Sequence, residues 1–300
     1  MKLVAGTSNS TLADSIAKKL GIEQISMQIA KFPNGEKRVW IQDEAKVRGE
    51  KIVIVQSFSH PTDENIIEFL LITDALERLG ARSASLVLPW MGYSFQDKVF
   101  RPGEPVAAKV VANLVSNAFI KRCFLLDLHN SSIPAFFSVP TDYISAIPLF
   151  TDFVKKKIDL NEAVVASPDF GGLKRARSFA GSLGLDLVKL DKHRDLHTGK
   201  VTAMGVHGNV FGRTVILFDD AILSGGTVIE AAAILKEQKA KKVYFLATHG
   251  LFVNKAQERL QKSPVDQIVV TNSIHQTQKF NKLKILNVAS LFADRLKDWI

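Results

Sequence analysis

The segment from Val215 to Lys239 constrains the fold of this 300-residue chain more than any other. An apolar run is followed directly by the carboxylates Asp219 and Asp220, then by a glycine-containing turn and an alanine-rich helical pattern. Backbone N–H groups at such a helix start can hold a phosphate, and paired carboxylates can accept hydrogen bonds from sugar hydroxyls. The alternative is an ordinary connection in which glycine and threonine only begin the helix. Two adjacent acids at the end of a core strand favour a ligand site.

Short apolar runs alternate with helical patterns along the chain, which predicts an α/β fold with mostly parallel sheets. Strands are expected at 51–55, 85–88, 122–128, 163–166, 185–190, 214–218, 242–247 and 267–270, and helices at 63–79 and 104–118. Residues 122–129 and 213–220 are both apolar strands that end in acids or histidine, which indicates an internal duplication. We therefore predict two tandem domains, 1–145 and 146–300, each a mostly parallel sheet flanked by helices.

Composition narrows the class of protein. No apolar run approaches the roughly 18 residues of a membrane span, and the N-terminus does not have the pattern of a signal peptide. Cys123 is the only cysteine, so we expect no intramolecular disulfide and a cytoplasmic setting. The net charge of +9 comes without an aromatic-basic recognition motif, which argues against nucleic acid. Phosphate-bearing small ligands fit the charge better.

Two further segments place polar residues after predicted strands. Asp127-Leu128-His129 ends one strand, and the segment 167–175 follows another and contains a glycine pair. A lone histidine is more often structural than functional. Because His129 and Asp169 both lie at strand ends, we predict that they border a magnesium site. Mg²⁺ prefers oxygen ligands and keeps several waters, so the imidazole is also compatible with a contact through water.

Lys192 and Arg194 alternate in an extended segment, which places them on the same side if the segment stays extended. The alternative is a solvated basic loop. The chain has no Gly-x-x-x-x-Gly-Lys-Ser/Thr loop, so the phosphates of a bound nucleotide would need other cations. We expect residues 192–205 to form a polar loop that closes over the reactants.

Two loops are ambiguous by themselves. Residues 32–36 have the composition of a tight turn, and residues 88–97 carry three aromatic side chains after a strand. Such aromatic residues suit a purine site or an oligomer interface.

Taken in order, these segments resemble the ribose-phosphate pyrophosphokinase (phosphoribosyl-diphosphate synthetase) family over nearly the whole chain. The matching elements are Phe-Pro-Asn-Gly-Glu at 32–36, Pro-x-x-Gly-Tyr-x-x-Gln-Asp at 89–97, Glu-Pro at 104–105, Asp-Leu-His at 127–129, Phe-Phe at 136–137, Ser-Pro-Asp-x-Gly-Gly-x-x-Arg-Ala at 167–176, Lys-x-Arg at 192–194, and the loop 219–227. That loop is similar to the phosphoribosyl-diphosphate loop of type I phosphoribosyltransferases.

The resemblance implies two phosphoribosyltransferase-like domains, assembly as homodimers within larger oligomers such as hexamers, and transfer of the β,γ-diphosphoryl group of ATP to O1 of ribose 5-phosphate. It implies catalytic roles for Lys192 and Arg194, and a Mg²⁺ site at His129 and Asp169. Ribose 5-phosphate would be held by Asp219, Asp220, Ser224, Gly225, Gly226 and Thr227. ATP would be contacted by Phe32, Asn34, Glu36, Gln96 and Asp97, the first three reaching a nucleotide bound mainly by a neighbouring subunit.

The chain departs from the family pattern at three places. Phe95 stands where the family usually has an arginine that touches the nucleotide, and Leu223 stands where many members have a further acid. Pro102-Gly103 replaces residues that include a basic effector-site side chain, so we expect weak or absent phosphate activation and ADP allostery. Two other functions therefore stay open, a non-catalytic regulatory paralogue and a phosphoribosyltransferase. Retention of Lys192 and Arg194 favours an enzyme.

Overall fold

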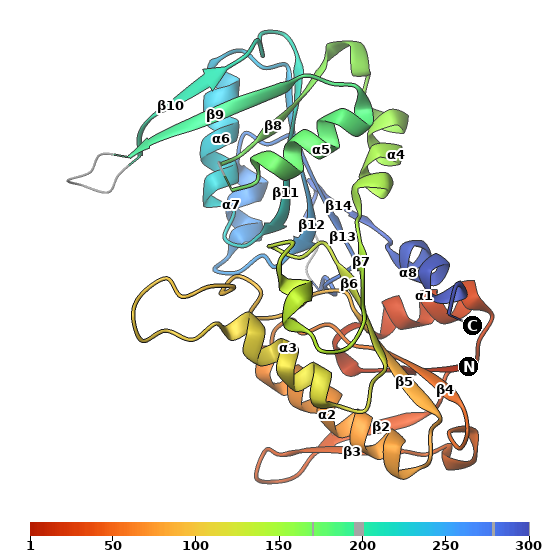
Figure 1. The fold of residues 1–300 in the computed structure, drawn as a ribbon. Helices are drawn as coiled ribbons and strands as arrows, with labels where there is room; N and C mark the ends of the chain where they lie inside the picture. The colour runs from red at the N-terminus through yellow and green to blue at the C-terminus, as the bar shows by residue number, and fades with distance from the viewer. Residues whose placement is uncertain (170, 195–200, 278–279, 300) are drawn as a thin grey trace. The chain divides into compact units, whose positions relative to one another are not determined.

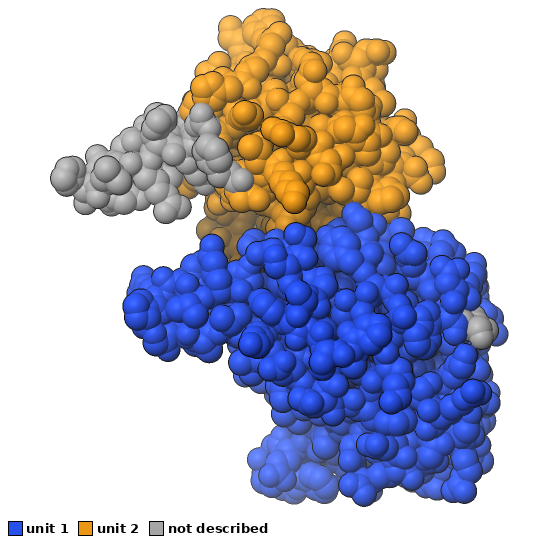
Figure 2. Space-filling view, viewed as in Figure 1, with its two compact units in different colours: residues 1–145, 273–275, 287–300 blue, residues 146–272, 276–286 orange. Residues whose placement is uncertain are grey.

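The computed structural model describes residues 1–169, 171–194, 201–277 and 280–299; the side chains of residues 191–204 are outside that description. The chain forms two compact units (Figure 2). Unit 1 contains residues 1–145, 273–275 and 287–300, and unit 2 contains residues 146–272 and 276–286. These units are defined by contacts within the chain and do not test a duplication. The two tandem domains predicted at 1–145 and 146–300 therefore stay a prediction.

Unit 1 is built on an all-parallel sheet with the strand order β1-β4-β5-β6-β7 (Figure 1). Its strands are β1 (Lys2–Ala5), β4 (Lys51–Val55), β5 (Ser83–Leu88), β6 (Arg122–Leu126) and β7 (Thr141–Ile144). Strand β4 is buried along nearly its whole length, as expected for a parallel strand covered on both faces. A separate antiparallel hairpin consists of β2 (Met27–Lys31) and β3 (Lys37–Ile41).

Helices cover both faces of this sheet (Figure 1). Helices α2 (Thr62–Arg78) and α3 (Ala107–Asn117) lie on one side, and α1 (Ser10–Leu20) and α8 (Ala289–Lys297) lie on the other. In α2 the buried residues Ile66, Phe69, Ile72 and Leu76 recur at helical spacing and pack on the sheet. Short 3₁₀ segments complete the unit at Thr7–Asn9, Glu44–Lys46 and Ile133–Phe136.

Unit 2 contains a seven-stranded sheet with the order β10-β9-β8-β11-β12-β13-β14, in which only β10 runs antiparallel to its neighbour. Its strands are β8 (Ala163–Ser167), β9 (Leu187–Arg194), β10 (Val201–His207), β11 (Thr214–Ile222), β12 (Lys242–Gly250), β13 (Gln267–Thr271) and β14 (Leu283–Leu286). Its helices are α4 (Ile147–Lys157), α5 (Leu173–Leu183), α6 (Gly226–Glu237) and α7 (Ala256–Lys262), with a 3₁₀ turn at Leu160–Glu162.

Alternate side chains of β11 supply the two cores of unit 2. Leu217 packs into the cluster that contains apolar residues of α6 and α7. Its neighbour Phe218 stacks on Phe179 of α5, with ring centroids 4.1 Å apart, and meets Phe150 of α4 edge-on at 5.5 Å. Successive strand residues face opposite sides of a sheet, so β11 packs against helices on both faces. This packing determines the position of the polar residues at the end of β11.

The predicted α/β class with mostly parallel sheets is confirmed. Several bounds were wrong: the strand predicted at 122–128 ends at Leu126, and the helix predicted at 104–118 begins at Ala107. Two further differences affect the site. Strand β9 does not end at residue 190 but continues to Arg194 and pairs with β10, so much of the expected 192–205 loop is a hairpin, with residues 195–200 outside the description. Strand β11 continues beyond Asp219 and Asp220 to Ile222, because its parallel ladder with β12 continues that far. Among the described residues, no helix has the length and apolar character needed to cross a membrane.

Candidate functional site

The paired acids of unit 2 lie beside an arginine from a neighbouring segment. Strands β8 and β11 are parallel neighbours, so the segments that follow them meet at one edge of the sheet. Arg175, in the first turn of α5, places one nitrogen (Nη1) 2.8 Å from Asp219 Oδ1 and 3.0 Å from Asp220 Oδ1. One guanidinium group therefore faces two carboxylates.

Two glycines in this region lie where a side chain would collide with neighbouring residues. A Cβ atom on Gly172 would lie 2.8 Å from Ser167 Oγ and 3.0 Å from Asp219 Oδ1, so a larger residue would displace the acid. Gly225 has a left-handed backbone (φ 75°) immediately before α6, and a Cβ there would lie 2.9 Å from Leu260. Glycine is favoured at both positions for these reasons.

The predicted sugar-phosphate residues flank the start of α6. Ser224 and Gly225 form the turn, and Gly226 and Thr227 are the first residues of the helix. The backbone carbonyl of Ser224 accepts a hydrogen bond of 2.6 Å from Arg259 Nη2. The first N–H groups of a helix have no partner within the helix, so this turn offers donors to an anion.

Burial and the neighbouring Asp220 raise the pKa of Asp219 to about 8, while Arg175 opposes the increase. Asp169 adds further negative charge nearby. The Asp219 side chain is 16% exposed, so solvent screens it only weakly. A carboxyl group with a perturbed pKa at a sheet edge is a common property of functional sites.

Asp169 lies on the same edge, directly after β8. Its Oδ1 accepts a hydrogen bond from Gly172 N at 3.1 Å, and its backbone carbonyl accepts one from Ser167 Oγ at 2.6 Å. Among the described residues, no three His, Cys, Asp or Glu side chains form a group that could hold a metal. Magnesium does not need such a cage, because it is often held by one or two carboxylates together with substrate phosphates and waters. The oxygen donors of Asp169 are compatible with that mode.

Lys192 and Arg194 belong to β9, where they pair in register with Met204 and Val201 of β10. Strand β9 is the parallel neighbour of β8, so the two residues lie at the end of the strand adjacent to the one that precedes Asp169. Their side chains lie outside the described part of the structure.

In unit 1, the loop after β5 meets the loop after β6. The Phe95 ring contacts the His129 ring edge-on at 4.8 Å and packs against Trp90 at 5.5 Å. Asn130 Nδ2 donates a hydrogen bond of 2.5 Å to Asp97 Oδ2. The structure thus brings two predicted site residues, His129 and Asp97, into adjoining loops, and Phe95 occupies the space beside the histidine.

Gln96 is held by its backbone at the start of α3. Its N–H donates to the carbonyl of Tyr93 at 3.1 Å, and its carbonyl accepts from Ala108 N at 3.1 Å. Its partly buried side chain follows Phe95 in the same loop.

Phe32, Asn34 and Glu36 lie on the exposed tip of the β2–β3 hairpin. The tip is closed by hydrogen bonds from Phe32 N to Glu36 O at 2.8 Å and from Gly35 N to Phe32 O at 2.9 Å, and Asn34 Oδ1 accepts from Glu36 N at 3.2 Å. Phe32 is 47% exposed, and a single exposed apolar residue is common on protein surfaces.

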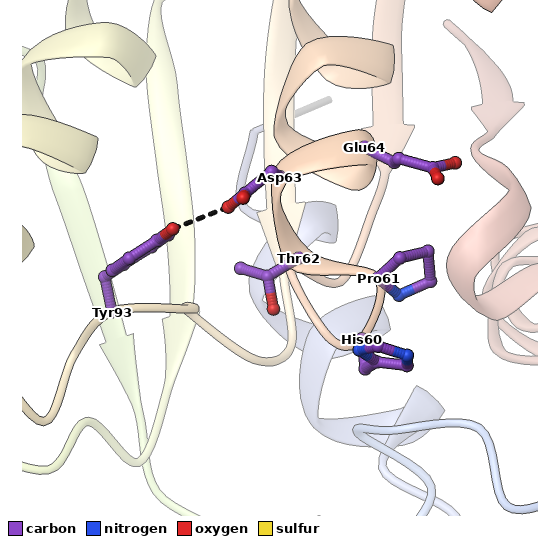
Figure 3. Close-up of a pocket in the computed structure, with 6 residues that line it drawn as sticks. All are labelled: His60, Pro61, Thr62, Asp63, Glu64 and Tyr93. Carbon is purple, nitrogen blue, oxygen red and sulfur yellow. Dashed lines mark hydrogen bonds between the residues drawn. The ribbon is translucent and has the colours of Figure 1, made fainter. Parts of the chain in front are cut away.

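A polar cavity of about 540 Å³, absent from the sequence predictions, lies at the start of α2 (Figure 3). It is lined by His60, Pro61, Thr62, Asp63, Glu64 and Tyr93. Asp63 and Tyr93 point toward each other, and the Tyr93 hydroxyl donates a hydrogen bond of 2.6 Å to Asp63 Oδ1 (Figure 3). This hydrogen bond raises the pKa of Tyr93.

Arg175 is the main residue that sequence reasoning missed. It was part of the 167–176 motif but was given no role, because its contact with the acids joins residues 44 and 45 positions apart. The available signal was its place one turn after a glycine pair that follows a strand.

Comparisons with known proteins agree over the whole chain. Residues 1–118 match the family model described as the N-terminal domain of ribose phosphate pyrophosphokinase, and residues 195–298 match the phosphoribosyl synthetase-associated domain. A ribose-phosphate pyrophosphokinase of Fusobacterium nucleatum is 39% identical over 99% of this chain and 94% of its own length. One from Helicobacter pylori strain J99 is 40% identical over 99% and 92%. The crystal structure of phosphoribosylpyrophosphate synthetase from Mycobacterium smegmatis matches with a TM-score of 0.91 and 34% identity, covering 99% of this chain and 98% of that one. The chain therefore belongs to the ribose-phosphate pyrophosphokinase family.

Proposed function

We propose that the chain transfers the β,γ-diphosphoryl group of ATP to O1 of ribose 5-phosphate, giving 5-phosphoribosyl 1-diphosphate and AMP. The observation that carries this proposal is the cluster of Asp219, Asp220 and Arg175 beside the glycine turn that opens α6. Family membership supports the same reaction.

The sugar phosphate occupies the loop 219–227. The carboxylates of Asp219 and Asp220 accept hydrogen bonds from ribose hydroxyls, and the backbone N–H groups of Gly225, Gly226 and Thr227 bind the 5-phosphate together with the Ser224 hydroxyl. Holding both ends of the sugar fixes the position of its O1. Phosphoryl transfer depends mainly on such positioning and on neutralisation of charge.

Lys192 and Arg194 supply positive charge to the transferring group from the β9–β10 hairpin. His129 and Asp169 would border Mg²⁺, which would neutralise charge on the phosphates of ATP. As the O1 hydroxyl attacks the β-phosphorus, its proton passes to water, the bond from the β-phosphorus to the α,β-bridging oxygen breaks, and AMP departs from the opposite side.

ATP is recognised by Gln96 and Asp97 and by the hairpin residues Phe32, Asn34 and Glu36, the latter reaching a nucleotide bound mainly by a neighbouring subunit. This requires a homo-oligomer. Exposed apolar side chains on α2 and α3, among them Ile67 and Val110, support self-association. Sedimentation of the purified protein measures its oligomeric state.

We assign the protein to the cytoplasm, a proposal that is supported by its single, buried Cys123.

The test is turnover of Mg-ATP and ribose 5-phosphate followed by ³¹P NMR. We expect AMP and phosphoribosyl diphosphate, and we expect Lys192→Ala to abolish their formation. Formation of ADP would indicate an ordinary kinase. Equal, negligible turnover by wild type and Lys192→Ala would indicate a regulatory paralogue. Repeating the assay with inorganic phosphate tests the expected weakness of phosphate activation.

A further inference from the structure

The loop end of the β2–β3 hairpin is fixed by a buried ion pair. Lys37 is the first residue of β3 and directly follows Glu36 of the tip. Its Nζ lies 2.5 Å from Glu68 Oε2 of α2, and the two side chains are only 9% and 0% exposed. A buried lysine requires a compensating acid, so the position of this lysine is tied to that of α2.

Glu68 also holds the edge of the parallel sheet. Its carboxylate accepts hydrogen bonds from Thr7 N at 2.6 Å, from Thr7 Oγ1 at 2.7 Å and from Gln56 Nε2 at 3.1 Å. Thr7 follows β1 and Gln56 follows β4, so both lie at the carboxyl edge of the sheet of unit 1. One carboxylate therefore connects the hairpin, helix α2 and the sheet edge.

A second lysine on the same hairpin offers a built-in contrast. Lys31 is paired in register with Lys37 across the hairpin, and its Nζ lies 2.8 Å from Glu64, one helical turn before Glu68. These side chains are 52% and 42% exposed, and Glu64 points away from Asp63 and Tyr93 in the cavity (Figure 3). An exposed pair is screened by solvent and contributes little to stability.

We propose that Lys37 and Glu68 are positioning residues for ATP. They touch no substrate; they hold the loop 32–36 in the conformation that receives the nucleotide. The effect on ATP rests on the proposed function, whereas the anchoring of the loop does not. When only a fraction of the molecules has the loop 32–36 in the binding conformation, the apparent affinity for ATP is the intrinsic affinity multiplied by that fraction. Saturating ATP restores full occupancy.

The experiment combines Lys37→Met with the double variant Lys37→Met/Glu68→Gln. The double variant removes both charges, which leaves no uncompensated buried ion and protects against failure to fold. We expect each variant to raise the KM for ATP about tenfold, with kcat and the KM for ribose 5-phosphate within about twofold of wild type. Lys31→Met is the matched control and leaves all three constants unchanged.

Hydrogen exchange provides a readout that does not depend on catalysis. The amides of Phe32, Gly35 and Glu36 should exchange at least tenfold faster in both Lys37 variants and at the wild-type rate in Lys31→Met. Unchanged exchange in a folded double variant overturns the anchor. If faster exchange is accompanied by an unchanged KM for ATP, the positioning role is overturned. Faster exchange in a protein whose wild type makes no phosphoribosyl diphosphate supports the anchor and overturns the proposed function instead.

Discussion

Glu68 in unit 1 and Asp219 in unit 2 are both carboxylates withdrawn from solvent, and their surroundings differ in one respect. Glu68 is met by four donor groups from Thr7, Gln56 and Lys37, and the lysine brings a full opposite charge. Asp219 is met by the N–H of Asp220 and by one guanidinium nitrogen of Arg175, which it shares with a second carboxylate. The first acid is fully compensated within the protein, and the second is not.

This difference in hydrogen-bond and charge partners distinguishes Glu68, which has a structural role, from Asp219, which is available to a ligand. Desolvation of an ion is costly unless hydrogen bonds and an opposite charge replace water. At Glu68 the fold supplies these partners, so a ligand has nothing to add. At Asp219, burial and the neighbouring Asp220 raise the pKa to about 8, and ligand hydroxyls or a cation would stabilise its ionised form. The comparison predicts opposite consequences when the two acids are neutralised.

The largest expected effect is on stability, in Glu68→Gln. Removing Glu68 leaves the buried Lys37 with only the half-exposed Glu64, whose Oε2 lies 3.8 Å away, as a counter-charge, and we expect the free energy of unfolding to fall by about 3 kcal/mol. Urea denaturation at pH 7 measures this change. Glu77→Gln on the exposed side of α2 serves as the control and leaves the urea midpoint unchanged. A fall no larger than that of the control would mean that Glu68 is not the structural member of the comparison.

Asp219→Asn should affect activity rather than folding. The amide keeps the shape of the side chain but cannot lose a proton to accept ribose hydroxyls as a carboxylate, so we expect kcat/KM for ribose 5-phosphate to fall about 100-fold, equivalent to about 2.7 kcal/mol. The melting temperature at pH 8 should stay equal to that of wild type or rise. Steady-state kinetics with saturating ATP, paired with a thermal melt, tests both statements. A variant that melts lower and retains its activity would reverse the assignment of the two acids.

The sequence predicted one half of this comparison and not the other. Asp219 and Asp220 could be predicted from the local sequence, because two acids follow an apolar run and precede a glycine turn. The Lys37–Glu68 pair joins residues 31 positions apart, and neither residue is unusual among its neighbours. Only the packing of the hairpin on α2 reveals that this lysine is buried. Local sequence patterns predict whether a segment is a helix or a strand and where a strand ends. Whether a buried charge has an opposite charge beside it depends on contacts between distant segments.

The same dependence on distant contacts explains which strand bounds were predicted correctly and which were not. Strand β4 was predicted with its correct bounds because residues 52–55 are an unbroken apolar run that begins directly after Lys51. The extension of β9 to Arg194 was missed because those residues are polar, and the strand exists through its pairing with β10. The role of Arg175 was missed for the same reason as that of Lys37, because Arg175 lies on α5 and its partners lie on the distant strand β11.

A smaller effect is expected in the pH dependence of stability. Asp219 holds its proton in the folded protein up to about pH 8, whereas in the unfolded chain it ionises near pH 4. The folded state therefore binds more protons than the unfolded state between these values, and stability falls as the pH rises from about 4 to 8. We expect this contribution to be about 2 kcal/mol. Urea midpoints of wild type and Asp219→Asn across this range measure it, and the difference between them should grow toward pH 8. Parallel curves would show that Asp219 is already ionised at pH 5.

The smallest effect is expected where an acid and a lysine meet in full contact with water. Lys241 Nζ lies 2.6 Å from Glu162 Oε2, nearly the distance of the Lys37–Glu68 pair, but these side chains are 56% and 53% exposed. Solvent screens such a pair, and holding two long side chains together costs conformational entropy. Lys241→Met should therefore leave the urea midpoint unchanged, while Lys37→Met, the same substitution at an equal distance, lowers it. Equal losses in the two variants would show that distance rather than burial decides the value of a charge pair in this protein, and the contrast between Glu68 and Asp219 would lose its physical basis.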